Sequence, residues 1–131
     1  MQWRTIPRGL RRATGAAALA LMAAVLVMGS QPVAVGFAAP GWDKLVHLAL
    51  HAVLAGLGVA ALGWRRAGWV LLACAAFGAL DEGLQSFYPG RSPSWADWAA
   101  DFAGAVLALG LLGALDALMP RAHRDPLVRG R

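Results

Sequence analysis

The chain of 131 residues is long enough for one domain, and 59% of its residues are hydrophobic while only 15% are charged. Soluble proteins have about 25% charged residues, so this composition excludes a soluble helical protein, which could not cover four apolar helices with so few polar groups. The net charge of +5 does not indicate nucleic-acid binding, because the basic residues stand beside apolar runs, as in membrane proteins.

Four apolar runs are predicted to be membrane-spanning helices, because each approaches the ~20 residues that a helix needs to cross a bilayer. In chain order they cover residues 13–29, 45–64, 67–87 and 95–119. Only Arg65 and Arg66 separate the second run from the third, which predicts a tight hairpin. We therefore expect an all-α membrane protein with a four-helix transmembrane bundle over residues 13–119, a basic segment before it (1–12) and a basic tail after it (120–131).

The basic residues predict that both termini are cytoplasmic (N-in, C-in). In this orientation ten of the twelve lysines and arginines lie on the inner side, and only Lys44 and Arg91 lie on the outer side. An alternative for the first run is a cleavable signal peptide, which the basic start and the small residues of "GFAAP" resemble. Its length of about 17 residues exceeds the usual 7–15. The remaining helices would keep their orientation in either case.

Aromatic residues agree with these boundaries, because all six tryptophans and the single tyrosine fall near a predicted membrane interface. Those at the outer boundary are Trp42, Tyr88, Trp95 and Trp98.

Polar residues gather toward the outer side, where five of the seven carboxylates fall. At a rise of about 1.5 Å per residue, His51 lies roughly 20 Å and Asp81 roughly 22 Å above the inner helix ends. By the same count, His47 and Asp101 both lie near ~26 Å, inside the outer part of a hydrocarbon core of about 30 Å. Ionisable side chains at such depth usually face the bundle interior or a water-filled cavity and pair with another group.

Three stripes at helical spacing support this inward direction, since each is polar at its outer end and small further in. Small residues let membrane helices approach closely, so we expect the three polar ends to meet at the outer mouth of a tightly packed bundle. The stripes are His47, His51, Ala55 and Gly58; Cys74, Gly78, Asp81 and Gln85; and Asp97, Asp101, Gly104 and Ala108. We interpret Cys74 as a packing residue, and His51 as a packing histidine bonded to Asp81 rather than a functional one.

Two blocks of sequence resemble the VanZ-like family of membrane proteins. They are "DKLVHLALHAVLAGLG" and "DEGLQSFYPGRSPSWADWAADFAGAVLALG", which stand in the family's order and span most of residues 43–110. One departure is Asp101, which stands where the family usually has asparagine, so any role that needs a neutral amide there is in doubt. The resemblance implies a small multi-pass protein of the bacterial cytoplasmic (inner) membrane. Founding members of the family are linked to low-level resistance to the glycopeptide teicoplanin.

Our first functional hypothesis is that the outer polar cluster binds a cell-envelope ligand, such as a lipid-linked or peptidoglycan-related molecule. An arginine suits a phosphate or carboxylate of such a ligand. The cluster consists of Asp43, Lys44, His47, Asp81, Glu82, Gln85, Arg91, Asp97 and Asp101.

A second hypothesis is a structural lock, in which Lys44 and Arg91 neutralise carboxylates and hold the helices together. Five carboxylates facing two permanent cations count against simple pairing, because three negative charges remain. A third is a hydrolase-type site, with His47 beside an aspartate for acid–base chemistry or metal binding. No ligand spacing or serine-nucleophile motif supports it, so we assign no catalytic residue, metal or cofactor.

Ion translocation is disfavoured, because the stripes become apolar further in. The bilayer is the expected partner, nucleic acid is not, and the thin bundle leaves oligomerisation open.

Overall fold

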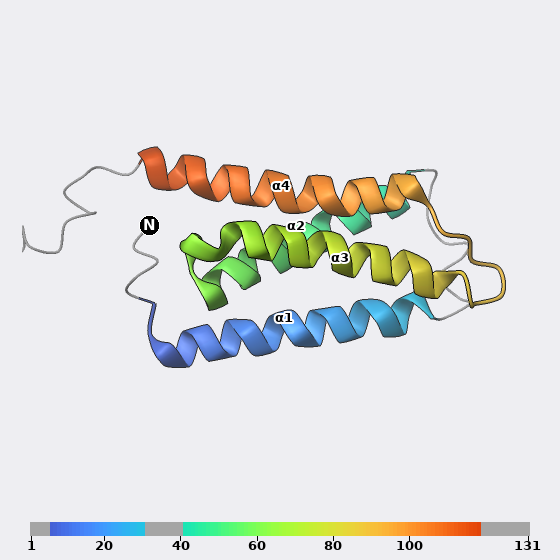
Figure 1. Cartoon of the computed structure of the whole chain (residues 1–131), viewed down its shortest axis with the longest axis horizontal. Coiled ribbons are helices and arrows are strands. Elements are labelled where there is room, and N and C mark those ends of the chain that lie inside the picture. The colour runs from blue at the N-terminus through green and yellow to red at the C-terminus, as the bar shows by residue number, and fades with distance from the viewer. Residues whose placement is uncertain (1–5, 31–40, 119–131) are drawn as a thin grey trace, which may run out of the picture.

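The computed structural model of the chain describes residues 6–30 and 41–118, and it places nearly all of them in four long helices (Figure 1). These are α1 (Arg8–Gly29), α2 (Trp42–Leu62), α3 (Ala67–Gln85) and α4 (Trp95–Leu118), and a 3-10 turn, η3 (Trp64–Arg66), leads from α2 into α3. No strand occurs in the described ranges. Each helix is long and apolar enough to cross a membrane, which confirms the predicted all-α four-helix bundle.

The helix boundaries differ from the predicted ones mainly in α1, which begins at Arg8 and so includes arginines that we had placed before it. The Arg11 side chain explains this, because its Nε donates a hydrogen bond to the Ala61 carbonyl at 2.8 Å and ties the start of α1 to the end of α2. Helix α2 ends at Leu62 because Gly63 takes a φ of 89°, a conformation that glycine adopts without strain. The predicted tail and the last residue of the fourth run lie outside the described residues.

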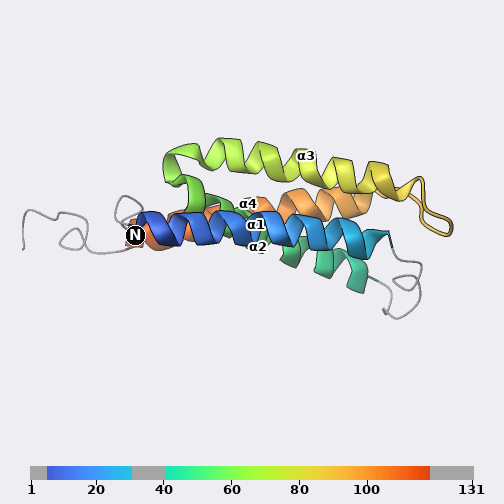
Figure 2. The same cartoon turned by 90° about the horizontal axis from the view of Figure 1, so that it is seen from below.

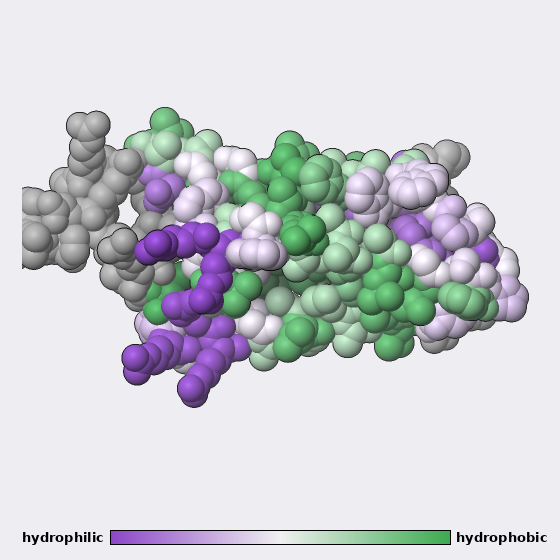
Figure 3. Space-filling model, in the orientation of Figure 1, coloured by the Kyte–Doolittle hydropathy of each residue, from purple (hydrophilic) through white to green (hydrophobic). Residues whose placement is uncertain are grey.

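The helices lie side by side with alternating direction, so the bundle has two different ends (Figures 1 and 2). Helix α2 makes its most extensive contacts with α4 and then with α1, while α3 packs mainly on α4. We call the end formed by residues 41–51, 81–85 and 91–101 the polar end. The start of α1 and η3 form the opposite, arginine end, and a hydrophobic belt separates the two (Figure 3).

The core lies between α2, α3 and α4 and is built from small and medium side chains. The predicted stripes face it, since Ala55, Cys74, Gly78 and Gly104 are all buried, as is expected for packing positions. Its buried hydrophobic residues are Leu54, Ala55, Val59, Val70, Cys74, Phe77 and Ala105.

Helices α2 and α4 approach each other closely at Gly104. A Cβ atom built on Gly104 would collide with the backbone carbonyl of Leu48, so the two backbones touch there without an intervening side chain. Such contact requires glycine at this position, in line with the role of small residues in membrane helix packing.

We predict that Gly104→Ala destabilises the bundle by about 1–3 kcal/mol, because the added methyl group must force α4 away from α2. Gly110→Ala is the matched control, since a Cβ on Gly110 of the same helix meets nothing within 4 Å. Thermal unfolding in detergent can be followed with a thiol-reactive dye that reports exposure of Cys74, the single, buried cysteine. Equal unfolding temperatures for the two variants would contradict the close contact.

Candidate functional site

The outermost contact of the polar end joins α2 to α4 through an ion pair. The Lys44 ammonium lies 2.9 Å from Oδ1 of Asp97 and 3.0 Å from Oδ2 of its neighbour Asp43. Asp97 stands in the first turn of α4, where its backbone N–H donates to the Oγ and carbonyl oxygens of Ser94. The Lys44 side chain is 44% exposed, so the pair contributes little to stability but sets the position of the Asp97 carboxylate.

One turn deeper along α4, the carboxylate of the buried Asp101 contacts two histidines of α2. Oδ1 of Asp101 lies 2.9 Å from Nδ1 of His47 and 2.7 Å from Nδ1 of His51. The histidines are four residues apart on α2 and therefore present their rings to the same carboxylate. Because an ionised carboxylate only accepts hydrogen bonds, both Nδ1 atoms carry the hydrogen in this arrangement.

The predicted bond between His51 and Asp81 is wrong, because His51 pairs with Asp101. Our count of the rise along each helix placed His51 and Asp81 at similar depths, but it did not specify which helices face each other. In the structure α2 packs chiefly on α4, so His51 meets the aspartate of α4.

Helix α3 contributes two adjacent carboxylates that point to different neighbours. Asp81 accepts a hydrogen bond from Nε2 of Gln85 on its own helix at 3.0 Å and lies against Gly29 of α1, where an added Cβ would be 3.2 Å from Asp81 Oδ1. Glu82 faces α4 instead, and its Oε2 accepts the backbone N–H of Ser94 at 2.6 Å. Consecutive helical residues differ by about 100° in direction, which accounts for the split.

Glu82 is buried, at 6% exposure, and within the described part of the chain its Oε1 atom has no hydrogen-bond partner. Most buried polar atoms in proteins have such a partner. Glu82 is therefore incompletely satisfied by the protein alone.

Arg91 lies in the loop between α3 and α4, after Gly90, whose φ of 81° turns the chain. Its backbone N–H donates to the carbonyl of Tyr88, and its Nε is buried without a hydrogen-bond partner among the described residues. In the same residues no carboxylate lies within ion-pair distance of its guanidinium. Arg91 is therefore not the neutralising group that a simple structural lock required.

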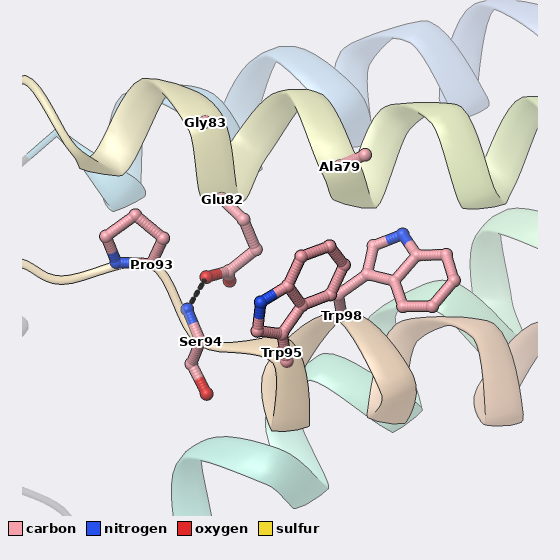
Figure 4. A pocket seen from close by; sticks show the side chains of 7 residues that line it. All are labelled: Ala79, Glu82, Gly83, Pro93, Ser94, Trp95 and Trp98. Carbon is pink, nitrogen blue, oxygen red and sulfur yellow. Dashed lines mark hydrogen bonds between the residues drawn. The ribbon is translucent and has the colours of Figure 1, made fainter.

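A pocket of about 230 Å³ opens beside Glu82, between the end of α3 and the start of α4 (Figure 4). The Trp98 indole is fixed by a hydrogen bond from its Nε1 to the Ala75 carbonyl at 3.0 Å, and Trp95 stands edge-on to it with ring centres 6.1 Å apart. The carboxylate of Glu82 lies between these rings and Pro93, where it meets the Ser94 amide. The lining residues are Ala79, Glu82, Gly83, Pro93, Ser94, Trp95 and Trp98.

Sequence reasoning missed the tryptophans as pocket residues, because their position at a membrane interface already accounted for them. Their spacing of three residues and the small Ala79 and Gly83 on the facing helix were the available signals. His51 and Ser94 were also absent from the predicted site, although both bond directly to members of it.

All nine predicted site residues lie at the polar end, but they form separate groups. Asp43, Lys44 and Asp97 are linked, His47 joins Asp101, and Asp81 joins Gln85, while Glu82 bonds to the Ser94 backbone and Arg91 lies in the loop. One atom each of His47, Glu82 and Asp97 lie within 4.8 Å of one another, a spacing at which the three could share a cation.

The four spans and the concentrated polar end define a multi-pass membrane protein of the helical-bundle class. Its sequence matches the VanZ/LLP1 family over residues 9–116, which is most of the chain, and the protein therefore belongs to that family. The resemblance inferred from the two sequence blocks is thus confirmed. No curated protein and no solved structure matches the chain.

We predict that Asp101→Ala lowers the unfolding temperature strongly, because the His47 Nδ1–H loses its acceptor, at about 1–3 kcal/mol, and His51 Nδ1 keeps only its 3.3 Å contact with the His47 carbonyl. Asp101→Asn should lose much less, because the amide oxygen still accepts and the side-chain shape is kept. The dye-based measurement on Cys74 compares both variants with the unaltered protein. The histidine–aspartate contact is not stabilising if Asp101→Ala unfolds at the same temperature as the unaltered protein.

Proposed function

We propose that this VanZ-family protein resides in the bacterial cytoplasmic membrane and binds a cell-envelope ligand at its polar end, on the extracytoplasmic side. The observation that carries the proposal is Glu82, a buried carboxylate with one unpartnered oxygen in a pocket walled by Trp95 and Trp98. A ligand that donates a hydrogen bond or carries positive charge would complete its coordination.

The distribution of charge supports the orientation. Arg8, Arg11, Arg12, Arg65 and Arg66 belong to the start of α1 and to η3, at the arginine end, whereas the described basic residues of the polar end are Lys44 and Arg91. The positive-inside rule then assigns the arginine end to the cytoplasm and the pocket to the outer leaflet.

The chemistry of the pocket indicates the class of ligand. Its walls are aromatic and apolar, which suits an acyl or prenyl portion, while Glu82 offers an acceptor for a polar head. Arg91 and Lys44 belong to the same end and suit phosphate or carboxylate groups. A lipid-linked or peptidoglycan-related envelope molecule combines these features, and such binding would connect the protein to glycopeptide susceptibility of the teicoplanin type.

The structural-lock hypothesis accounts for a different part of the polar end. Oδ1 of the buried Asp101 contacts two histidines of the facing helix, as a helix-joining contact should, although Asp101 Oδ2 and His51 Nε2 have no hydrogen-bond partner among the described residues. Glu82 is paired through one oxygen only, which accepts the Ser94 amide, while its other oxygen is buried without a hydrogen-bond partner among the described residues. We therefore assign the joining of α2 to α4 to the Asp101 contact and the binding function to the Glu82 pocket.

The orientation predicts opposite labelling of two single cysteines in a Cys74→Ala background. Ser92→Cys, in the exposed loop of the polar end, should react with a membrane-impermeant maleimide in intact cells. Gly9→Cys, an open position at the start of α1, should react only after the membrane is disrupted. The reverse pattern would place the pocket in the cytoplasm and refute the proposed site.

The binding function predicts that Glu82→Gln and Trp95→Ala each raise teicoplanin susceptibility roughly tenfold in a strain that depends on this protein, equivalent to about 1.4 kcal/mol of lost binding. Both changes leave the contact of Asp101 with its two histidines unaltered. Trp69→Ala is the control, since Trp69 is another exposed tryptophan of the chain but lies near the opposite end of α3. Unchanged susceptibility in variants present at normal levels in the membrane would count against the proposal.

A further inference from the structure

We propose that the polar end also binds one divalent transition-metal cation, held by His47, Glu82 and Asp97. The three residues come from three different helices, α2, α3 and α4, and one potential ligand atom of each lies within 4.8 Å of the others. An imidazole and two carboxylates form a mixed nitrogen and oxygen set of the kind that binds such cations.

Each of the three side chains is held by a neighbour through one atom while its other atom is left for an ion. His47 directs Nδ1–H to Asp101, which leaves the Nε2 lone pair. Glu82 accepts the Ser94 amide on Oε2, and Asp97 accepts Lys44 on Oδ1, so Oε1 and Oδ2 remain. Metal ligands in proteins are typically oriented in this way by hydrogen bonds to their far atoms.

Glu82 supplies an independent indication that something is bound. Its Oε1 is buried and unpartnered, and the residue is 6% exposed, so neither the described residues nor bulk water complete its coordination. Charge points the same way, because five carboxylates of this end face Lys44 and Arg91 as the permanent cations. A divalent cation offsets two of the three excess negative charges.

The ligand set favours a first-row transition-metal cation, such as Zn²⁺ or Mn²⁺, over Ca²⁺, Mg²⁺ and soft ions. Ca²⁺ and Mg²⁺ prefer oxygen ligands throughout, and a soft thiophilic ion would need sulfur, whereas Cys74 is not a member of the group. Zinc bonds of about 2.0–2.2 Å place the ligand atoms within about 4.4 Å of one another, a separation compatible with this group. Three protein ligands leave a coordination position open to another molecule.

This open position deepens the proposed function, on which the identity of the second molecule rests. A phosphate or carboxylate of an envelope ligand could occupy it from the pocket, since Glu82 belongs to both the pocket and the ion site. The binding of the ion itself does not depend on that ligand.

The test uses untagged, full-length protein in detergent, stripped with a chelator and titrated separately with Zn²⁺ and Mn²⁺ alone. We expect one ion per chain by calorimetry and elemental analysis, together with a higher unfolding temperature at saturation. Glu82→Gln and Asp97→Asn should each weaken binding by at least about tenfold, and Asp101→Asn, which alters the partner of His47, by about tenfold or more. Asp43→Asn is the matched control, because Asp43 is an exposed carboxylate at the same end that contacts Lys44 but is no ligand.

The proposal is overturned if the unaltered protein binds neither cation stoichiometrically, or if Glu82→Gln and Asp43→Asn bind it equally well. Failure of the ligand proposal is distinguishable from this result. If Zn²⁺ or Mn²⁺ binds as expected but Trp95→Ala leaves susceptibility unchanged, the ion site stands and the envelope ligand falls. If Trp95→Ala changes susceptibility but no ion binds, the envelope-ligand proposal is kept and the ion site is rejected.

Discussion

The contact of Asp101 with His47 and His51 is the constraint on which the rest of the polar end depends. A carboxylate at 0% exposure within a membrane-spanning helix is strongly destabilising unless it is paired, so α4 must bring it to the two histidines of α2. That pairing fixes the register of the two helices. Lys44 then meets Asp97 one turn above, and Gly104 meets the Leu48 backbone about one turn below.

With α2 and α4 joined in this register, α3 fits against them through glycine and glutamate. A Cβ on Gly78 would lie 2.6 Å from Oδ2 of Asp101, so only glycine lets α3 approach the buried carboxylate. One turn further along, Glu82 reaches the Ser94 amide at the start of α4. Asp81 precedes Glu82 by one residue, so its side chain points in another direction around α3 and faces α1. The polar end is thus divided by helix geometry into a paired region and an open one.

The sequence predicted how deep each polar residue lies along its helix. It predicted only in part which neighbouring helix each side chain faces. His47 and Asp101 were placed at one depth, and they lie 2.9 Å apart. The bond of His51 to Asp81 was wrong because depth alone does not choose between two facing helices. The pocket could not be predicted, since it depends on the loop conformation that brings Ser94 and Trp95 beside Glu82. The orientation and the binding role of the nine residues stay predictions.

The backbone contact at Gly104 has a mechanical consequence. Because α2 and α4 touch without an intervening side chain and are joined by buried polar pairs, sliding one helix along the other would break both contacts. Helix α3 is attached to this pair at both ends, through Gly63 and η3 at one end and through the loop of residues 86–94 and the Glu82 bond to Ser94 at the other. The hydrogen bond from Trp98 to the Ala75 carbonyl joins α4 to the middle of α3. The pocket lies beside the second attachment, so any change in its width requires the Glu82 bond to Ser94 or the loop itself to move.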